Sequence, residues 1–388
     1  MSGIVLSAAV RQNLLSLQDT ASLLSTTQNR LATGNKVNSA LDNPTNFFTA
    51  QGLDNRASDI NNLLDSIGNG VQVLQAANTG LTSLQKLVDT AKSIANQVLQ
   101  APAGYTAKST STSTTLVGTA SAANLVDGVG FKANQTLAIA ASGELPAITV
   151  TFGATESLDQ LNTSLAAGGL TASIDSSNHL VITTTNDYAG QTIGTITPGS
   201  TPGTTTFGAA TAPTADAASQ AIRTSLVGQY NNIITQITTT SQDSSFNGIN
   251  LLNGDNLKLT FDETGKSTLN ITGVTYNATG LGLGSLTSGT DFLDNASANA
   301  TLTKLGAAST TLRTEASALG SNLSVVQLRQ DFNKSLINVL QTGSSNLTLA
   351  DANQEAANSQ ALSTRQSIAV SALSLANQSQ QSVLQLLR

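Results

Sequence analysis

Residues 6–34 read LSAAVRQNLLSLQDTASLLSTTQNRLATG, and this stretch decides the fold. Its apolar and small residues recur at steps of three and four, a spacing that lines one side of a helix and requires a partner helix. The stretch predicts a helix over residues 4–33 that ends at Thr33-Gly34. The repeat positions are Leu6, Val10, Leu14, Leu17, Ala21, Leu24, Gln28 and Leu31.

The same repeat returns near the other end of the chain, between residues 302 and 340. Because the two repeats lie at opposite ends, they predict long antiparallel helices, with the middle of the chain forming a separate part. This organisation is typical of a building block for a helical assembly and unlike a catalytic domain. The positions are Leu302, Leu305, Ser309, Leu312, Ala316, Leu319, Leu323, Val326, Gln330, Asn333, Ile337 and Leu340.

Turn residues and periodicity place the other elements. A loop follows the first helix, and Pro44 marks the restart, since the residue before a proline is pushed out of the helical region. Further helices are predicted over residues 45–100, 217–240, 298–341 (ending at Thr342-Gly343) and 348–387, and a hairpin over residues 257–261 and 267–271 around Glu263-Thr264-Gly265.

Residues 102–215 differ in composition from both flanks and are called the insert below. Five of the six prolines lie between residues 102 and 213, in a stretch rich in Thr, Ser and Gly. Alternation of apolar and polar residues predicts strands at residues 147–152 and 179–183. We interpret the insert as a small β-rich domain between two helices; the alternative is a disordered polar linker.

Charged residues make up 10% of the chain, against about 25% in typical soluble domains. The formal net charge is -6 and no basic run occurs, so the composition argues against a nucleic-acid partner. The expected surface is polar but uncharged. Such a surface has little long-range repulsion that would prevent close packing of one copy against another.

Residues that usually carry catalysis are sparse. His179 is the one histidine in the sequence, so two-histidine metal motifs are excluded. Thr264-Gly265-Lys266-Ser267 lacks the earlier glycine of a phosphate-binding loop, because position 260 is threonine. Gly280–Gly284 lacks the spacing of a dinucleotide-binding turn. We therefore predict no catalytic, cofactor-binding or metal-binding residue, and we do not expect an enzyme.

The sequence contains no cysteine, which excludes disulfides and thiolate chemistry. Residues 1–10 lack the basic and apolar regions of a secretory signal. No run of about 18 apolar residues occurs, so no membrane span is expected. If the protein leaves the cell, we expect a route that does not depend on a cleaved signal.

Three stretches carry a family resemblance. Residues 30–48, RLATGNKVNSALDNPTNFF, closely resemble the N-terminal signature of bacterial flagellins. Residues 246–252, FNGINLL, resemble the segment that precedes the hairpin in that family, and residues 376–388 resemble its C-terminus. The resemblance covers residues 1–100 and 217–388. The insert precedes the 217–240 helix, whereas in the best-known flagellins the major insert follows the hairpin.

The resemblance implies three layers of a filament. Residues 1–44 with 345–388 would form the inner core helices, residues 45–101 with 216–344 an outer helical bundle with the hairpin, and residues 102–215 the surface. Gly34, Asn43 and Pro44 would form a hinge loop. The expected subunit-packing residues are Leu14, Leu17, Leu24, Leu31, Ile60, Leu64, Ile67, Leu74, Leu319, Leu323, Val326, Leu375, Val383 and Leu386.

The resemblance also implies a function, a location and partners. The chain would be a structural subunit that polymerises with itself into the extracellular flagellar filament, for swimming motility, after export through the flagellar type III apparatus. Its partners would be an export chaperone, the filament cap and hook-junction proteins, and the insert would carry O-glycans in some members. The alternatives are a hook–filament junction protein of the same family, or an adhesin or enzyme function carried by the insert.

Overall fold

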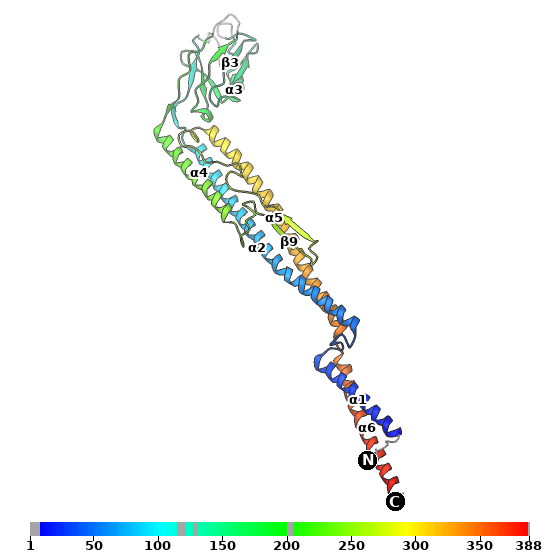
Figure 1. The fold of residues 1–388 in the computed structure, drawn as a ribbon. Coiled ribbons are helices and arrows are strands. Elements are labelled where there is room, and N and C mark those ends of the chain that lie inside the picture. Colours follow the sequence, from blue (N-terminus) through cyan, green and yellow to red (C-terminus); the bar gives the residue numbers. More distant parts are fainter. Residues whose placement is uncertain (1–7, 115–121, 127–130, 200–204, 387–388) are drawn as a thin grey trace. The chain divides into compact units, whose positions relative to one another are not determined.

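The computed structural model describes residues 8–114, 122–126, 131–199 and 205–386, and it is mainly helical with a β-rich insert (Figure 1). This confirms the predicted fold class. The insert precedes α4, as the sequence indicates. The helices are α1 (Ala8–Thr33), α2 (Pro44–Gln100), α3 (Leu158–Ala166), α4 (Ala217–Asp243), α5 (Asn295–Thr348) and α6 (Ala352–Leu386).

Contacts within the chain divide it into two compact units. The first comprises Met1–Gly70, Lys258–Leu269 and Val325–Arg388, and the second comprises Val71–Leu257 and Asn270–Ser324. These boundaries cut through α2 and α5 and differ from the three predicted layers. The layers describe an arrangement in a filament, so they stay a prediction.

In the first unit, α1 and α6 pack along one another, and the start of α1 lies at the same end of this pair as the end of α6 (Figure 1). The paired helices run antiparallel, because the end of α1 meets the start of α6. The predicted C-terminal repeat between residues 302 and 340 lies in α5, so the helix that pairs with α1 is not the one that carries this repeat. The first part of α2 and the last part of α5 pack through a small apolar cluster of Ala57, Ile60, Ile337 and Leu340.

The second unit contains α4, the insert and the remaining parts of α2 and α5. Buried residues of α2 continue the three-four spacing through Leu81, Leu84 and Val88. Gly80 permits a close approach of α2 and α4, since a Cβ atom there would lie 2.2 Å from the Ser244 hydroxyl oxygen. A glycine that costs helix stability is therefore required by packing at this position.

The insert is built from two three-stranded sheets and α3. One sheet has the order β2 (Thr110–Thr112), β6 (Leu180–Thr184), β5 (Leu170–Ile174), and the other the order β4 (Ile148–Thr151), β3 (Thr136–Ile139), β7 (Ile196–Pro198). A ribbon of β1 (Tyr105–Ala107) and β8 (Thr214–Ala215) joins the two ends of the insert. The predicted strands at residues 147–152 and 179–183 correspond to β4 and β6.

Alternation of side chains along the strands gives the insert a core of its own. In β6 the inward residues Leu180 and Ile182 are buried, while Val181 and Thr183, which alternate with them along the strand, are partly exposed. Helix α3, which the sequence did not predict, starts at a capping box in which Ser157 and Gln160 bond each other's backbone amides. Its Leu161 and Leu165 complete the core.

The predicted hairpin consists of β9 (Leu257–Thr260) and β10 (Thr268–Ile271). Gly265 has a φ of 72°, the left-handed conformation that glycine adopts without strain in a tight turn. The Asp262 carboxylate accepts a hydrogen bond from the Ser267 amide at 2.9 Å and fixes the turn. This geometry agrees with a hairpin turn over Thr264–Ser267.

Helix α4 ends at Asp243 and α5 starts at Asn295, each three residues outside its predicted bounds, and two other predicted boundaries differ by more. Helix α5 does not end at Thr342-Gly343 but continues to Thr348, because Gly343 lies against Leu53 of α2 and the Ser344 hydroxyl donates to Asp54 at 2.8 Å. Tertiary contacts thus override the glycine stop signal. Helix α6 starts at Ala352 and not at residue 348, since Asp351 accepts hydrogen bonds from the amides of Asn353 and Gln354. The predicted start of the first helix at residue 4 lies outside the described residues.

Candidate assembly interface

The seam between α1 and α6 is largely polar. On α6 the least exposed positions are separated alternately by four and three residues. On α1 they are separated alternately by three and four residues, except that the last separation is three where four would follow. Few of them are large and apolar, so the pair buries little apolar area for its length. The positions are Val10, Asn13, Leu17, Thr20, Leu24, Thr27 and Arg30 on α1, and Glu355, Ser359, Leu362, Gln366, Ala369, Leu373 and Ala376 on α6.

The end of α1 and the start of α6 are held by specific polar contacts. Arg30 Nη1 lies 3.3 Å from Glu355 Oε1, and the Glu355 residue is 8% exposed. The Lys36 amide donates to the Thr348 carbonyl at 2.7 Å, and the Ala350 amide donates to the Gly34 carbonyl at 2.9 Å. These contacts fix the register of the two helices at one end of the pair.

The predicted hinge residues lie in the loop between α1 and α2. Gly34 has a φ of 71°, which glycine adopts readily, and it ends α1 as predicted. The Asn43 side chain accepts from the Asn46 amide at 3.0 Å and caps α2, whose first residue is Pro44. Asp42 accepts hydrogen bonds from the two amides of Asn38-Ser39, which lower the pKa of its carboxyl group. The loop is therefore well organised.

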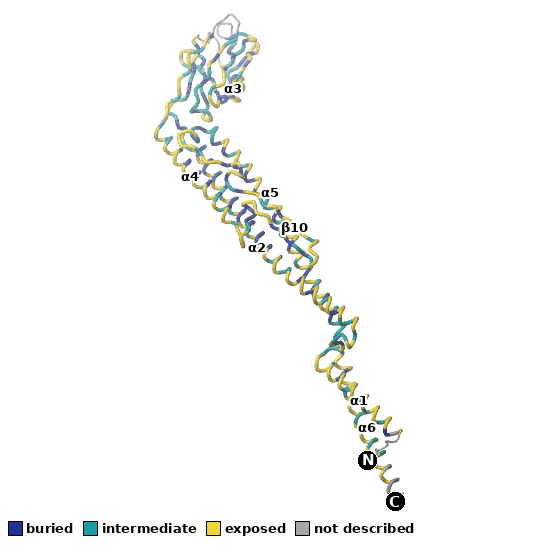
Figure 2. The backbone as a smooth tube through the Cα atoms, viewed as in Figure 1, coloured by how far each residue is buried: buried dark blue, intermediate teal, exposed yellow. Residues whose placement is uncertain are grey.

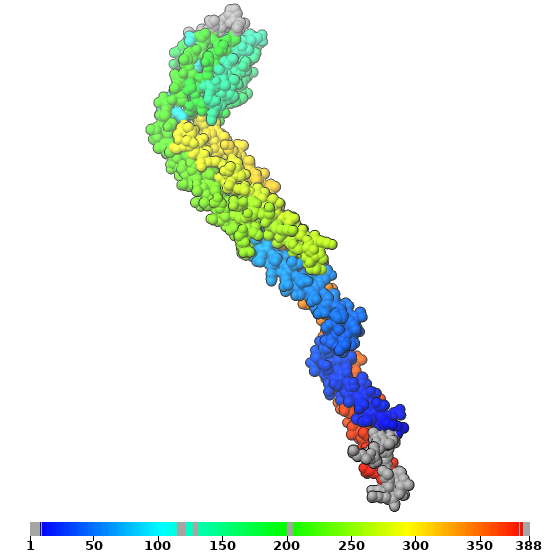
Figure 3. Space-filling view, in the orientation of Figure 1, coloured from blue at the N-terminus to red at the C-terminus, as the bar shows by residue number. Residues whose placement is uncertain are grey.

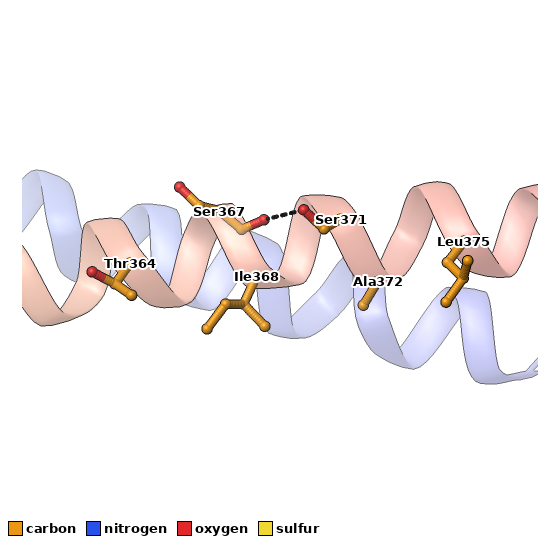
Figure 4. A pocket seen from close by; sticks show the side chains of 6 residues that line it. All are labelled: Thr364, Ser367, Ile368, Ser371, Ala372 and Leu375. Carbon is orange, nitrogen blue, oxygen red and sulfur yellow. Dashed lines mark hydrogen bonds between the residues drawn. The ribbon is translucent and has the colours of Figure 1, made fainter.

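Much of α1 and α6 is exposed (Figure 2), and the exposed residues of these helices include large apolar ones. Leu14 and Leu31, predicted as packing residues, are 37% and 43% exposed, and Leu375 is 69% exposed. Ile368, Ala372 and Leu375 lie along one face of α6 and, with Thr364, Ser367 and Ser371, line a shallow groove of about 570 Å³ (Figure 4). In the space-filling view, blue N-terminal and red C-terminal residues share the surface of this pair (Figure 3).

A second exposed apolar stripe lies on the part of α5 that belongs to the first unit. Leu328, Phe332 and Val339 are 71%, 56% and 66% exposed. With Val325 they are spaced by three, four and seven residues, which places them on one face of the helix. The sequence analysis did not predict this stripe, although its spacing is visible in the sequence, because the repeat from Leu302 to Leu340 runs along another face of the same helix.

The predicted packing residues fall into three groups. Leu14, Leu31 and Leu375 are exposed, and their role between copies stays a prediction. Several others pack within their own chain, either fully or in part. Val383 and Leu386 lie near the end of α6, and their side chains are outside the described part of the structure. The residues that pack internally are Leu17, Leu24, Ile60, Leu64, Ile67, Leu74, Leu319, Leu323 and Val326.

His179, the histidine of this chain, forms contacts with a neighbouring carboxylate. His179 Nδ1 lies 3.4 Å from Asp175 Oδ2 in the turn between β5 and β6, where the Asp175 carboxylate also accepts from the His179 amide. Within the described residues, no three His, Asp or Glu side chains gather as metal ligands would. The helices that the structure describes also lack the combination of length and hydropathy needed to cross a bilayer.

Comparison with protein families gives two matches. Residues 5–126 match the model described as the bacterial flagellin N-terminal helical region, and residues 302–387 match the bacterial flagellin C-terminal helical region. Together the two ranges make up more than half of the chain. They include both terminal helices and leave most of the insert, α4 and the hairpin unmatched.

Individual relatives agree with the family match. The chain is 32% identical over 164 residues to flagellin FljM and 30% identical over the same length to flagellin FljK, both from Caulobacter vibrioides. These alignments cover 42% of this chain, and the chain spans 59% of the length of each of these relatives. Flagellin A of Rhizobium meliloti is 37% identical over 93 residues, which are 24% of each chain.

Proposed function

The chain belongs to the bacterial flagellin family, and on that premise we propose that it is a structural subunit that polymerises with itself into the flagellar filament. The family is structural, so the proposed role needs no catalytic activity. The filament lies outside the cell and serves swimming motility. Both family models and the relatives named above are flagellins, so neither the junction protein nor an enzyme or adhesin is favoured.

One observation carries this proposal: the first unit leaves regular apolar stripes uncovered on long helices. Ile368 and Leu375 on α6 and Leu328, Phe332 and Val339 on α5 are each more than half exposed. Burying one such side chain stabilises a complex by about 1.5–3 kcal/mol. With few charges on the chain to oppose close approach, a second copy is the partner that these stripes fit best.

We further propose that folding of α1 and α6 is coupled to assembly. Their shared seam contains Thr, Ser, Asn and Gln, so the apolar area that it buries offsets little of the entropy lost on ordering. Contacts with neighbouring copies would supply the missing burial. The loop with Gly34, Asn43 and Pro44 would then act as the hinge that lets the inner helices take alternative positions.

The finer expectations about partners remain part of the proposal. Export by the flagellar type III apparatus, with a chaperone, and contacts with the cap and hook-junction proteins follow from family membership. The insert offers many hydroxyl groups to O-glycosylation, among them Thr149 and Thr171 on outward positions of its strands. The three filament layers would be residues 1–44 with 345–388, residues 45–101 with 216–344, and residues 102–215.

The test is polymerisation of purified subunits onto short filament seeds, followed by electron microscopy, for the full chain and for a chain lacking residues 347–388. Long filaments from the full chain alone are expected, since the truncation removes α6. A chain lacking residues 105–214 is the matched control, and it should still polymerise. Short rings from the full chain would identify a junction protein, and growth without α6 would contradict the proposed interface.

A further inference from the structure

Arg223 is the least expected residue in the interior of the second unit. It lies on α4 and is 2% exposed, although a guanidinium keeps its charge at all physiological pH values. A buried cation destabilises a fold unless its donors are satisfied. In a chain with so few charges, a buried guanidinium indicates that Arg223 has a specific structural role.

Four hydrogen bonds satisfy the guanidinium, and they connect separate segments. Nε donates to the Pro102 carbonyl at 3.0 Å, and Nη2 donates to the Ala101 carbonyl at 3.3 Å. Nη1 donates to the Phe292 carbonyl at 2.9 Å, and Nη2 also reaches the Asn295 side-chain oxygen at 3.3 Å. One side chain of α4 thus binds the end of α2 and the start of α5.

The contacts of Arg223 with Ala101 and Pro102 place its cation beside the C-terminal end of α2. The last four carbonyls of any helix require donors from elsewhere, and a cation near them interacts favourably with the helix dipole. Ala101 and Pro102 directly follow Gln100, the last residue of α2, so Arg223 binds the two carbonyls just beyond the end of this helix.

The segment before α5 is held in an unusual conformation. Phe292 has a φ of 60°, a left-handed backbone conformation that residues other than glycine rarely adopt. Its ring is fully buried and packs against Tyr230, with 5.9 Å between the ring centroids. The Phe292 amide donates a hydrogen bond to the Ser297 hydroxyl at 3.1 Å. A strained residue persists only where its surroundings fix it, and Arg223 holds its carbonyl.

The chain leaves the helical bundle for the insert at the end of α2 and returns to it at the start of α4. The insert starts directly after Ala101, and the Asp216 amide donates to the Gly104 carbonyl at 2.9 Å, so its two ends meet. Asp216 then caps α4 by accepting from the Ser219 amide. Arg223 lies about two turns further along α4 and binds the segment from which the insert departs.

We propose that Arg223 is the positioning residue that closes this end of the bundle, fixing the end of α2 and the start of α5 independently of what the insert does. The insert is then a module whose movement or replacement leaves the helices undisturbed. This inference depends on the geometry of the second unit and not on polymerisation. Lysine could not replace the residue, because an ammonium group lacks the planar fork that reaches carbonyls in several directions.

Charges around the site are consistent with a structural role. Burial lowers the pKa of the Arg223 guanidinium, and the nearby carboxylate of Asp294 and the Tyr105 phenol oppose that effect. Burial also raises the pKa of Asp294, which caps α5 by accepting from the Ser297 amide at 3.2 Å. The cation is thus partly balanced by a carboxylate on one of the segments that it binds.

The test is hydrogen exchange followed by mass spectrometry on the full chain and its Arg223→Met variant. We expect exchange of amides in residues 99–104 and 290–297 to rise at least tenfold, with the insert core around 180–184 unchanged. Arg313→Met, an equivalent change at an exposed position on α5, is the matched control and should change nothing. Unchanged exchange in the two segments, or an equal rise throughout the chain, would overturn the proposal.

Two further variants keep the test decisive if Arg223→Met does not fold. Arg223→Lys retains the charge and most of the volume, so we expect a local rise of about threefold to tenfold, with a melting temperature close to that of the parent chain. Replacing residues 105–214 by a short Gly-Ser linker should leave both segments protected while Arg223 is present. Loss of protection in the linker chain, or full protection of both segments in the Arg223→Lys variant, would contradict the assignment.

Discussion

The insert and the α1–α6 pair differ in where they place their large apolar side chains. The insert closes around a core in which the rings of Phe131 and Phe152 stack at 4.4 Å, and most of its large apolar side chains are buried. The helix pair has a polar seam and leaves residues such as Leu15 and Ile368 exposed on its outer faces. The insert thus has a closed core of its own, whereas the helix pair keeps apolar surface that the proposed filament would cover.

The difference teaches how a low-charge chain separates folding from assembly. A small domain needs a closed apolar core to offset conformational entropy. A helix pair that keeps its apolar residues outside gains most of its stability only when another surface covers them. The two regions should therefore respond differently to the same kind of change, in the order given below.

The largest effect is expected in the insert. Phe152→Ala removes a fully buried ring and should destabilise the insert by about 3–5 kcal/mol. Urea unfolding followed by hydrogen exchange should show loss of protection in β3 and β6 at lower urea, with the bundle unaffected and seeded growth retained. Thr149→Ala, an exposed change on β4, is the control. A parallel loss in the bundle would show that the insert is not independent.

Alkaline pH should separate the second unit from the helix pair. Burial raises the pKa of Tyr230 to about 12, with Asp291 adding to the effect. The unfolded chain ionises this phenol near its ordinary pKa, so the stabilisation is complete below pH 10 and is lost as the pH rises towards 12, about 2–3 kcal/mol in all. Helices α1 and α6 contain no tyrosine.

Circular dichroism melts between pH 8 and 12 would measure this effect. The melting temperature of the bundle should fall above pH 10, and Tyr230→Phe should make this fall smaller. Tyr276, whose pKa is also raised by burial and by its hydrogen bond to Glu315, would account for the remaining dependence. A melting temperature that does not change up to pH 12 would contradict the linkage.

A smaller effect is expected at the polar end of the helix pair. Glu355→Gln keeps the shape of a buried side chain but removes its charge opposite Arg30, and we expect a loss of about 1 kcal/mol. Amide exchange of residues 24–36 and 352–359 in assembled material should rise about fivefold. Asp331→Asn removes one charge of an exposed ion pair with a separation of 3.8 Å and should have no measurable effect. An equal rise in exchange in the two variants would contradict the expectation that the buried Arg30–Glu355 pair contributes more than the exposed Asp331–Lys334 pair.

The smallest effect on the free subunit is expected at an exposed apolar residue of α6. Ile368 is 64% exposed, so Ile368→Ser should change the free energy of unfolding of the monomer by less than about 0.5 kcal/mol. The same change should raise the concentration needed for seeded growth several-fold, because it removes apolar area at the proposed interface. Thr364→Ser, on the same groove, is the control. Growth at the parent concentration would argue against this face as the interface.

Much of the fold follows from local patterns, and the failures have physical causes. The repeat that ends at Leu31 predicted α1, but of its described positions only Val10, Leu17 and Leu24 lie in the seam with α6, since the preferred face depends on the partner. Gly343 predicts the end of α5 by its local signal, but the helix continues to Thr348 because Gly343 contacts Leu53 of α2, a residue far away in the sequence. The buried Arg223 gave no signal, as burial of a charge is decided by distant segments.

The family, the helical ends, the β-rich insert and the low-charge surface can be inferred from the sequence, because motifs, periodicity and composition are local properties of the chain. Which apolar residues are buried and which stay exposed follows from the tertiary structure. It also decided that one arginine joins the ends of two helices. Such outcomes depend on contacts between segments far apart in the chain, such as Arg223 with Ala101 and Phe292, whose distances no local pattern encodes.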